Sequence, residues 1–369
     1  MALIAGVLGY GERGKTLVKV IQENVPEVKL VAVADPVLER RKEAKDRKLI
    51  AYETEEELFD KTNPEVVVIA TNPPQHCEQV LMAAEYGCHI LCEKPLALSP
   101  EEADRMILAV RKAGVISAVD FETIFSDSFE ALRVELQREA FGRLIRFDAV
   151  DKGRPPAYDI ETCMPHFLHA FMQLTRSRPT EVFGRVIVDG RKATLDDVVS
   201  INNLYPQGRT HDIGMRADTI EASYLFENGV TARYFLAQLD EAYVIEAGKH
   251  AKPGSEFMNF VAYGTRGQIK WHQTSMGYVY RKEVPQDTRT VMNWELVYAP
   301  EKPDPAWTVP TTRLVKDFVD AIKFDREPMA TIEDAAAVVD QTYGIYVSHL
   351  ADRPVKLPLE DRRHPLRLK

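Results

Sequence analysis

The chain has 369 residues, 45% of them hydrophobic and 28% charged, a composition that excludes collagen, coiled-coil and disordered proteins. Lys and Arg number 47 against 56 Asp and Glu, which gives a formal net charge of −9, and no basic stripe carries interleaved aromatic residues. We therefore expect no nucleic acid and no membrane among the partners. The length allows two domains, each with its own core.

The first residues carry no basic leader, and their apolar run breaks at glycines within the first ten positions. This pattern predicts neither a signal peptide nor a membrane span, so we expect a cytoplasmic protein. The four cysteines form no C-x-x-C pair, which predicts reduced thiols that serve in packing. They are Cys77, Cys88, Cys92 and Cys163.

The first 120 residues alternate short apolar runs with helical patterns, which is typical of parallel strands joined by crossover helices. Thr54 with Glu57, and Ser99 with Glu102, have the spacing of capping boxes and mark two helix starts. We predict a doubly wound Rossmann sheet in a dinucleotide-binding domain over 1–122. Its strands are expected at 3–8, 29–34, 65–71, 89–92 and 115–121.

Beyond residue 122 the segments lengthen, alternate in polarity and are joined by hairpin turns. Asn228-Gly229 between two alternating runs is a strong hairpin signal, and Gly264 to Gly267 separates a second pair of runs. We therefore predict a mostly antiparallel sheet in a second α/β domain over 123–369. Helical patterns return at 129–139, 162–175, 312–324 and 332–349.

The first candidate site is the motif G-x-G-x-x-G, which directly follows the first predicted strand and opens a helical pattern. Glycines at these positions let the backbone approach a pyrophosphate, which then lies on the N–H groups of the helix N-terminus. The motif predicts a dinucleotide site. Its residues are Gly9, Tyr10, Gly11, Glu12, Arg13 and Gly14.

Asp35 closes the second predicted strand, 21 residues after Gly14. An acidic side chain at this place accepts hydrogen bonds from the ribose hydroxyls of NAD and repels the 2′-phosphate of NADP. We therefore predict NAD as the cofactor, with NADP less favoured. Arg40 and Arg41 follow closely and could soften that preference.

Two further predicted strands end in Thr71-Asn72-Pro73-Pro74-Gln75-His76 and in Glu93-Lys94-Pro95. The carboxyl ends of strands are where doubly wound sheets bind ligands. The stretch from Tyr86 to Pro95 resembles the A-G-x-H-V-L-C-E-K-P segment of the family named for glucose-fructose oxidoreductase, inositol dehydrogenase and the rhizopine-catabolism protein (Gfo/Idh/MocA). The resemblance extends over nearly the whole chain.

The resemblance implies that Lys94 is a catalytic residue held beside the nicotinamide, on a Lys-Pro bond that is often cis. An ammonium there can donate to a substrate oxygen and stabilise developing alkoxide charge. The resemblance also implies that Thr71, Asn72, Pro73, His76 and Glu93 belong to the cofactor site.

The family's second catalytic motif, a helix with D-x-x-x-H, is matched by His166, which is expected to act as acid and base. Thr162 stands at the aspartate position and His169 where a second aspartate is common, so the substrate is expected to be unusual for the family. Asp159 or Glu161 could supply the missing carboxylate. The predicted substrate-binding residues are Glu122, Asp159, Glu161, Thr162 and His169. Cys163, His166 and His169 share a helical face, but without a clear fourth ligand we predict no metal.

The resemblance implies an NAD-dependent oxidoreductase that transfers a hydride between the cofactor and a secondary hydroxyl or ketone of a sugar, polyol or sugar derivative. Two alternatives are glycoside cleavage through transient oxidation by a retained NAD, and a non-catalytic sensor of dinucleotide and sugar. Retention of Lys94 weighs against the sensor. Because relatives bury the open sheet face against a second subunit, we expect a homodimer or homotetramer.

Overall fold

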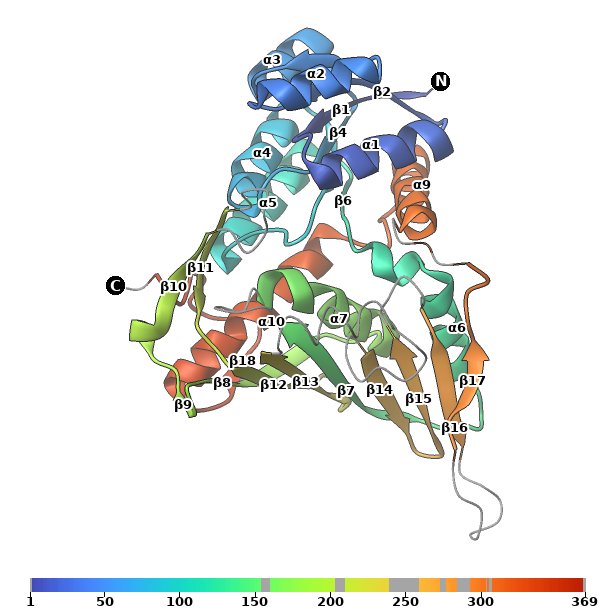
Figure 1. Cartoon of the computed structure of the whole chain (residues 1–369), viewed down its shortest axis with the longest axis vertical. Coiled ribbons are helices and arrows are strands. Elements are labelled where there is room, and N and C mark those ends of the chain that lie inside the picture. The colour runs from blue at the N-terminus through green and yellow to red at the C-terminus, as the bar shows by residue number, and fades with distance from the viewer. Residues whose placement is uncertain are drawn as a thin grey trace. The chain divides into compact units, whose positions relative to one another are not determined.

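The computed structural model describes residues 2–153, 160–202, 210–238, 259–272, 277–283, 293–302, 304 and 307–367. The chain divides into two compact units (Figure 1). The first comprises Met1–Glu122, Tyr205–His211 and Ala306–Val339, and the second comprises Thr123–Leu204, Asp212–Pro305 and Asp340–Lys369. The sequence-based division placed all residues after 122 in the second domain, whereas 306–339 lie with the first unit.

The first unit is built on a six-stranded sheet in which every pair of neighbours is parallel. Its strand order is β3-β2-β1-β4-β5-β6, so the sheet is doubly wound outward from β1 and β4. Nearly all side chains of β1 and β4 are buried, as expected for parallel strands covered on both faces. The strands are β1 (Leu3–Leu8), β2 (Val28–Ala34), β3 (Ile50–Tyr52), β4 (Val66–Ile69), β5 (His89–Cys92) and β6 (Ser117–Val119).

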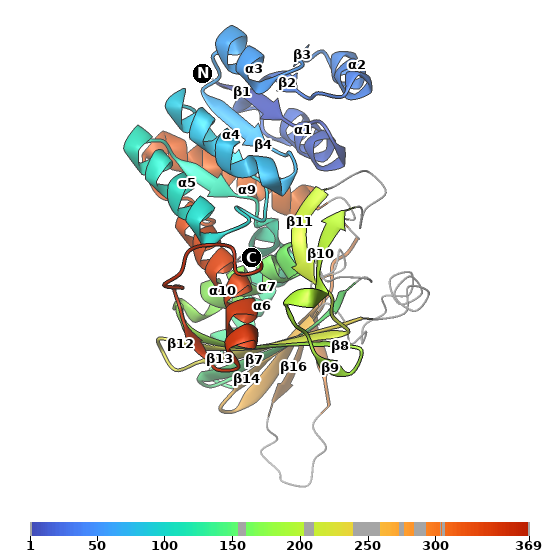
Figure 2. The ribbon, with the colours of Figure 1, turned by 90° about the vertical axis from the view of Figure 1, so that its left-hand side faces the viewer.

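Helices cover both faces of this sheet, with α1 and α4 on opposite sides (Figure 2). Both predicted helix starts are confirmed, because Thr54 Oγ1 accepts from the Glu57 N–H at 3.4 Å and Ser99 Oγ from the Glu102 N–H at 3.1 Å. The boxes are not closed, since Glu57 and Glu102 accept from the N–H groups of Glu53 and Leu98, one residue before each cap. The helices are α1 (Glu12–Asn24), α2 (Leu38–Asp46), α3 (Glu55–Thr62), α4 (Pro73–Glu85), α5 (Pro100–Ala113) and α9 (Thr308–Phe324).

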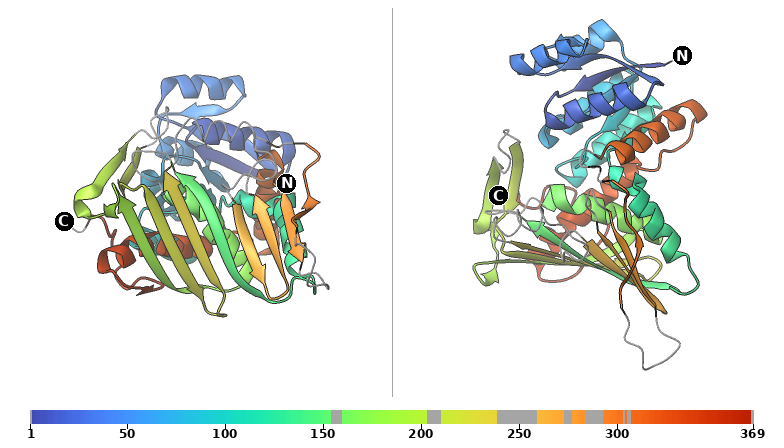
Figure 3. Two further views of the ribbon diagram at one scale, coloured as in Figure 1. Left: turned by 60° about the horizontal axis from the view of Figure 1, so that its bottom comes forward. Right: turned by 45° about the vertical axis from the view of Figure 1, so that its right-hand side comes forward.

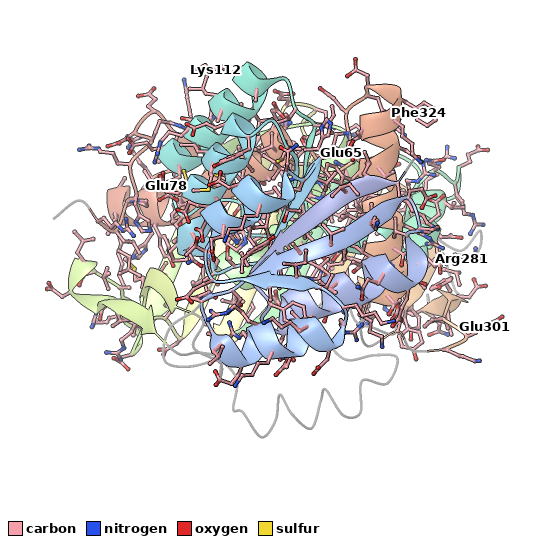
Figure 4. All side chains as sticks on the ribbon, turned by 90° about the horizontal axis from the view of Figure 1, so that it is seen from above. Glu65, Glu78, Lys112, Arg281, Glu301 and Phe324 are labelled. Atoms are coloured by element: carbon pink, nitrogen blue, oxygen red, sulfur yellow. The ribbon has the colours of Figure 1, made fainter. Side chains whose placement is uncertain are left out.

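Helix α9 packs against α1 and so joins the cofactor unit from far along the chain. Its last residue, Phe324, is 72% exposed and points away from the helices in Figure 4. Glu78 on α4, labelled in the same view, pairs with Arg105 on α5 at 2.8 Å. In the described part of the chain, no helix combines the length and the apolar character needed to cross a membrane.

The second unit contains a ten-stranded sheet with the order β17-β16-β15-β14-β7-β13-β12-β8-β18, to which β9 adds beside β8. The β7–β13 pair is parallel and the other pairs are antiparallel, so the predicted fold class is confirmed. The strands are β7 (Leu144–Gly153), β8 (Pro179–Val188), β9 (Arg191–Lys192), β12 (Thr219–Phe226), β13 (Thr231–Gln238), β14 (Asn259–Gly264), β15 (Gly267–His272), β16 (Val279–Glu283), β17 (Glu295–Tyr298) and β18 (Val355–Lys356). A separate two-stranded sheet pairs β10 (Val198–Asn202) with β11 (Thr210–Met215).

Helices α6 (Asp127–Leu136), α7 (Ile160–Thr175) and the later part of α10 (Ile332–Ala351) lie on one face of this sheet (Figure 1). The core beneath α7 is aromatic: Phe171 stacks on Phe147 at 4.8 Å, and Phe260 meets Trp271 at 5.2 Å between ring centroids. No described element covers the opposite face, which is seen in the left view of Figure 3. Along β12 the side chains alternate strictly between this open face and the core.

Helix α10 packs directly against strand β8. A Cβ on Gly184 would lie 2.4 Å from the Ile345 carbonyl oxygen, so the helix runs directly over the strand backbone. Ser348 Oγ accepts from the Gly184 N–H at 2.9 Å, and His349 Nδ1 accepts from the Val186 N–H at 3.1 Å. His349 Nε2 therefore carries the proton and donates to the Ala193 carbonyl at 2.8 Å, while burial lowers the pKa of the ring.

We expect Gly184→Ala to destabilise the protein by about 1–3 kcal/mol, because the added methyl group would force α10 away from β8. Lys316→Ala, on the exposed side of α9, is the control and should stay within about 0.5 kcal/mol. Thermal unfolding followed by circular dichroism compares the two. Equal midpoints for both variants would show that the contact between Gly184 and α10 is not tight.

Candidate functional site

The turn between β1 and α1 is fixed by two glycines. Gly9 has φ +86°, and a Cβ there would lie 2.7 Å from the Ala70 carbonyl oxygen, so the end of β1 touches the end of β4. A Cβ on Gly14 would lie 2.1 Å from the Gly9 carbonyl oxygen, so α1 starts directly against the turn. Gly11 differs, because the nearest atoms to a Cβ at its position belong to Arg40 and are 3.9 Å away.

The N-terminus of α1 fits the pyrophosphate of a dinucleotide. Gly11 is the N-cap and supplies no side chain to the first N–H groups of the helix. The open space beside Gly11 lets a ligand come close to the backbone, and the helix dipole favours an anion there. Tyr10 is buried below the turn, and Glu12 is exposed and lies 3.5 Å from Lys15. Within the G-x-G-x-x-G motif, the glycines are therefore the residues whose geometry suits NAD.

Asp35 is more enclosed than the sequence predicts, since it is 1% exposed at the end of β2. Its Oδ2 accepts from the Tyr10 N–H at 2.8 Å and its Oδ1 from the Val37 N–H at 2.9 Å. Arg40 Nη1 lies 3.4 Å from Oδ2, and Arg40 is itself 35% exposed. The carboxylate thus holds the glycine turn, and Oδ1, which accepts from the Val37 N–H, has a second acceptor position that a ribose hydroxyl could use.

The end of β4 leads into α4 through Thr71, Asn72 and Pro73. Asn72 is the N-cap without a side-chain cap bond, and Thr71 Oγ1 donates to Gln79 at 2.5 Å. His76 is completely buried, with Nδ1 at 2.9 Å from the Pro95 carbonyl and Nε2 at 3.3 Å from the Thr71 carbonyl. These contacts make His76 a residue that joins two strand-end loops, and burial lowers its pKa.

The loop after β5 carries Glu93, the half-buried Lys94 and Pro95, and the Lys94–Pro95 peptide is cis. Arg13 Nε donates to Glu93 Oε1, and Arg13 Nη2 donates to Asp120 Oδ2 at 2.6 Å. Glu93 Oε2 accepts from the backbone N–H of Lys94 at 3.1 Å. The start of α1, the end of β5 and the end of β6 are therefore connected through buried ion pairs.

Asp120 and Glu93 both bind Arg13, and their pKa values shift in opposite directions. Burial raises the pKa of Asp120 well above its ordinary value; Arg13 opposes this shift, and Glu93 and Glu122 add to it. Burial also acts to raise the pKa of Glu93, but Arg13, a hydrogen bond from Asp120 and Lys94 outweigh it and lower the pKa to about 2. These surroundings therefore favour the protonated form of Asp120 and the ionised form of Glu93. Glu122 Oε1 lies 4.0 Å from Arg13.

In the second unit, His166 is half-buried on α7 directly after Pro165. Its Nδ1 lies 3.2 Å from Thr123 Oγ1, a buried hydroxyl on the short helix Glu122–Phe125. His169, one turn further along α7, is completely buried, with Nε2 3.3 Å from Gln173 Nε2. The two histidines therefore have different surroundings, and only His166 reaches the surface of its unit.

Several predicted residues lie outside what the structure describes. Asp159 is not among the described residues, and the side chains of Glu161, Thr162 and Cys163 are not described either. The assignment of Asp159, Glu161 and Thr162 to the substrate, like that of Glu122 and His169, stays a prediction. Over the described ranges, His, Cys, Asp and Glu side chains nowhere gather in a group of three that could hold a metal ion.

Sequence reasoning missed two partners of the predicted residues. Asp120, which holds Arg13, follows β6 as Asp35 follows β2, and an acid at a strand carboxyl end is the signal that could have found it. Thr123 gives no such signal, because its partner His166 lies 43 residues away in the sequence. Arg13 was predicted only as part of the glycine motif, whereas its side chain binds carboxylates.

Comparison with known proteins agrees with this geometry. Residues 3–121 match the model of the oxidoreductase family with an NAD-binding Rossmann fold (Gfo/Idh/MocA). A myo-inositol 2-dehydrogenase of Thermotoga maritima is 26% identical over 276 residues, which cover 69% of this chain and 81% of that protein. A 1,5-anhydro-D-fructose reductase of Ensifer adhaerens is 29% identical over 287 residues, covering 76% of this chain and 75% of that protein.

Among solved structures, a levoglucosan dehydrogenase in complex with NADH and levoglucosan has the same fold. It superposes with a TM-score of 0.75 at 19% identity, covering 97% of this chain and all of that chain (100%). The match thus includes both units of the present chain. On the family match over 3–121, the Rossmann domain of this chain belongs to the Gfo/Idh/MocA family of NAD-binding oxidoreductases.

Proposed function

We propose that the protein is a cytoplasmic NAD-dependent dehydrogenase that interconverts a secondary hydroxyl and a ketone on a sugar, polyol or sugar derivative. The observation that carries the proposal is Lys94, which stands on a loop fixed at the carboxyl edge of the cofactor sheet. The names of the two curated relatives support a polyol or sugar as the substrate class. Cys77, Cys88 and Cys92 are free and buried, which suits a reducing compartment.

In this proposal bound NAD accepts or returns the hydride. Lys94 donates a hydrogen bond to the substrate oxygen and stabilises the negative charge that develops on it. His166 takes the hydroxyl proton, and Thr123, through its contact at 3.2 Å with Nδ1, fixes the orientation of the imidazole. Asp35 and the glycine turn hold the dinucleotide, because they combine a buried acceptor with an open helix N-terminus.

We expect Lys94→Ala and His166→Ala each to lower kcat by about 10²–10⁴, the range typical of general acid–base groups. NADH affinity should stay within a few-fold in both variants. The measurement is a screen of sugars and polyols with NAD⁺, followed by NADH absorbance and then by kinetics on the best substrate. Lys112→Ala, an exposed lysine on α5, is the matched control and should keep full turnover.

Near-full turnover by His166→Ala on the true substrate would contradict its role, and Asp159, Glu161 or His169 would be the next candidates for the base. If the wild type binds NADH but forms none from any polyol or sugar, the dehydrogenase proposal fails. Turnover of a glycoside without net NADH would point to cleavage by transient oxidation instead.

The environment of Asp35 predicts a preference for NAD over NADP that can be reversed. Asp35→Ser removes the charge that repels a 2′-phosphate and leaves Arg40 without its carboxylate, so the ratio of NADP⁺ to NAD⁺ affinity should rise at least about tenfold. In the double variant Asp35→Ser, Arg40→Gln the part of this gain that comes from Arg40 should be lost. Dissociation constants from fluorescence titration with NADH and NADPH decide it. Tighter binding of NADPH by the wild type would refute the role of Asp35.

We also propose a homodimer or homotetramer in which a second copy covers the open face of the large sheet. This face carries partly buried aromatic side chains, among them Phe183, Phe235 and Tyr263, and Arg146 lies 4.7 Å above the Tyr263 ring. Side chains of this size on an uncovered ten-stranded sheet form the kind of patch that mediates association.

Light scattering should therefore give a mass of at least twice 41.8 kDa at micromolar concentration. Phe235→Arg should shift the protein toward the monomer, because it places a charge in the buried interface. Leu108→Arg, on the exposed side of α5, is the control and should not change the mass. A wild-type mass of 41.8 kDa would contradict the proposal.

A further inference from the structure

Arg13 lies in a cluster of buried carboxyls that the proposed hydride transfer does not use. Its Nε binds Glu93 and its Nη2 binds Asp120 at 2.6 Å, with Glu122 4.0 Å from Nη2. The Asp120 side chain is 0% exposed and that of Glu93 is 9% exposed. Three carboxyls therefore compete for one guanidinium inside the cofactor unit. Burying more carboxyls than there are cations to pair with them destabilises the folded protein.

The cluster has fewer donors than acceptors. Within the described part of the chain, Asp120 Oδ1 and Glu122 Oε2 are buried without a hydrogen-bond partner. Burial favours a proton on Asp120, which would relieve part of this excess, while Glu93 stays ionised beside Arg13. The strongest link in the cluster is thus the one between Arg13 and Glu93, a charge-assisted hydrogen bond.

Glu93 connects Arg13 to the backbone of Lys94. While Oε1 is held by Arg13, Oε2 accepts the N–H of Lys94 at 3.1 Å. On the other side of Lys94, the Pro95 carbonyl is 2.9 Å from Nδ1 of the buried His76. The backbone is therefore held on both sides of Lys94, at its own N–H through Arg13 on α1 and at the Pro95 carbonyl by His76 on α4.

We propose that Arg13 is a positioning residue for Lys94, acting through Glu93 to fix the backbone from which the lysine side chain extends. This inference rests on the proposed function, in which Lys94 binds the substrate oxygen. A catalytic group needs its backbone held to within a fraction of an ångström, and a displacement of about 1 Å can cost on the order of 10² in rate. The competing role for Arg13 is that of a cofactor ligand, which its place in the glycine motif suggests.

The two roles predict different measurements on Arg13→Gln. If Arg13 positions Lys94, kcat falls at least about tenfold, NADH affinity stays within about threefold, and amide exchange over 92–98 quickens at least about tenfold in the cofactor-free protein. Hydrogen–deuterium exchange with mass spectrometry gives the last quantity without any substrate. Lys15→Gln is the control, since Lys15 lies on the same helix and pairs with the exposed Glu43 and Glu12. It should change none of the three quantities.

A double-mutant cycle tests whether Arg13 acts through Glu93. Glu93→Gln should reproduce the effects of Arg13→Gln, and the double variant should be no worse than the more damaged single variant, because both changes break one link. Arg13→Lys keeps the charge but loses the planar fork that holds Glu93 and Asp120 together, so it should not restore exchange protection. It also covers the case in which Arg13→Gln does not fold.

A rise of more than about tenfold in the NADH dissociation constant of Arg13→Gln, with exchange over 92–98 unchanged, would overturn the proposal and make Arg13 a cofactor ligand. Additive effects in the cycle would overturn the route through Glu93. If no polyol or sugar is oxidised by the wild type, the proposed function fails, while the exchange and binding data still decide whether Arg13 holds the Lys94 loop.

Discussion

The steric contact between α1 and the end of β1 is the constraint on which the cofactor unit depends. Because Gly14 sits against the Gly9 carbonyl with no space for a side chain, the direction in which α1 leaves the sheet is fixed. That direction brings Arg13 to Glu93 and Asp120, and the same turn presents the Tyr10 N–H to Asp35. A looser turn would separate the ends of four strands that here meet through hydrogen bonds.

Electrostatics at this edge of the sheet follows from the parallel topology. All strands of the unit end at one edge, so the acids that follow β2, β5 and β6 all lie at the edge where α1 begins, and those after β5 and β6 share Arg13. Two features of the unit reduce the repulsion between these negative charges. Asp35 is paired with backbone N–H groups and Arg40, and burial raises the pKa of Asp120 and so favours its uncharged form.

The sequence allowed prediction of those features that local chemistry determines. The order of strands and helices, the caps at Thr54 and Ser99, the cis bond before Pro95 and the hairpin at Asn228-Gly229 are present as predicted. The partners of Arg13 and His166 could not be predicted, because residues 80 and 43 positions apart meet only through the tertiary fold. The short β3 was missed because three half-exposed residues give no clear periodicity. The burial of Asp35 was not predicted, because every residue but proline has a backbone N–H and the sequence does not show which of them bind the carboxylate.

The hydrogen bonds of His349 make the edge of the large sheet vulnerable to acid. Its neutral ring accepts from one backbone group and donates to another, and a second proton would turn the acceptor on the Val186 N–H into a donor. Because burial lowers the pKa of His349 below its ordinary value of 6.5, an unfolded chain takes up protons that the folded chain refuses as the pH falls below that value. Acidification therefore favours states in which β8 is uncovered, and an uncovered strand is a template for pairing with other chains. An acid-precipitation step during purification would therefore weaken the contact between α10 and β8.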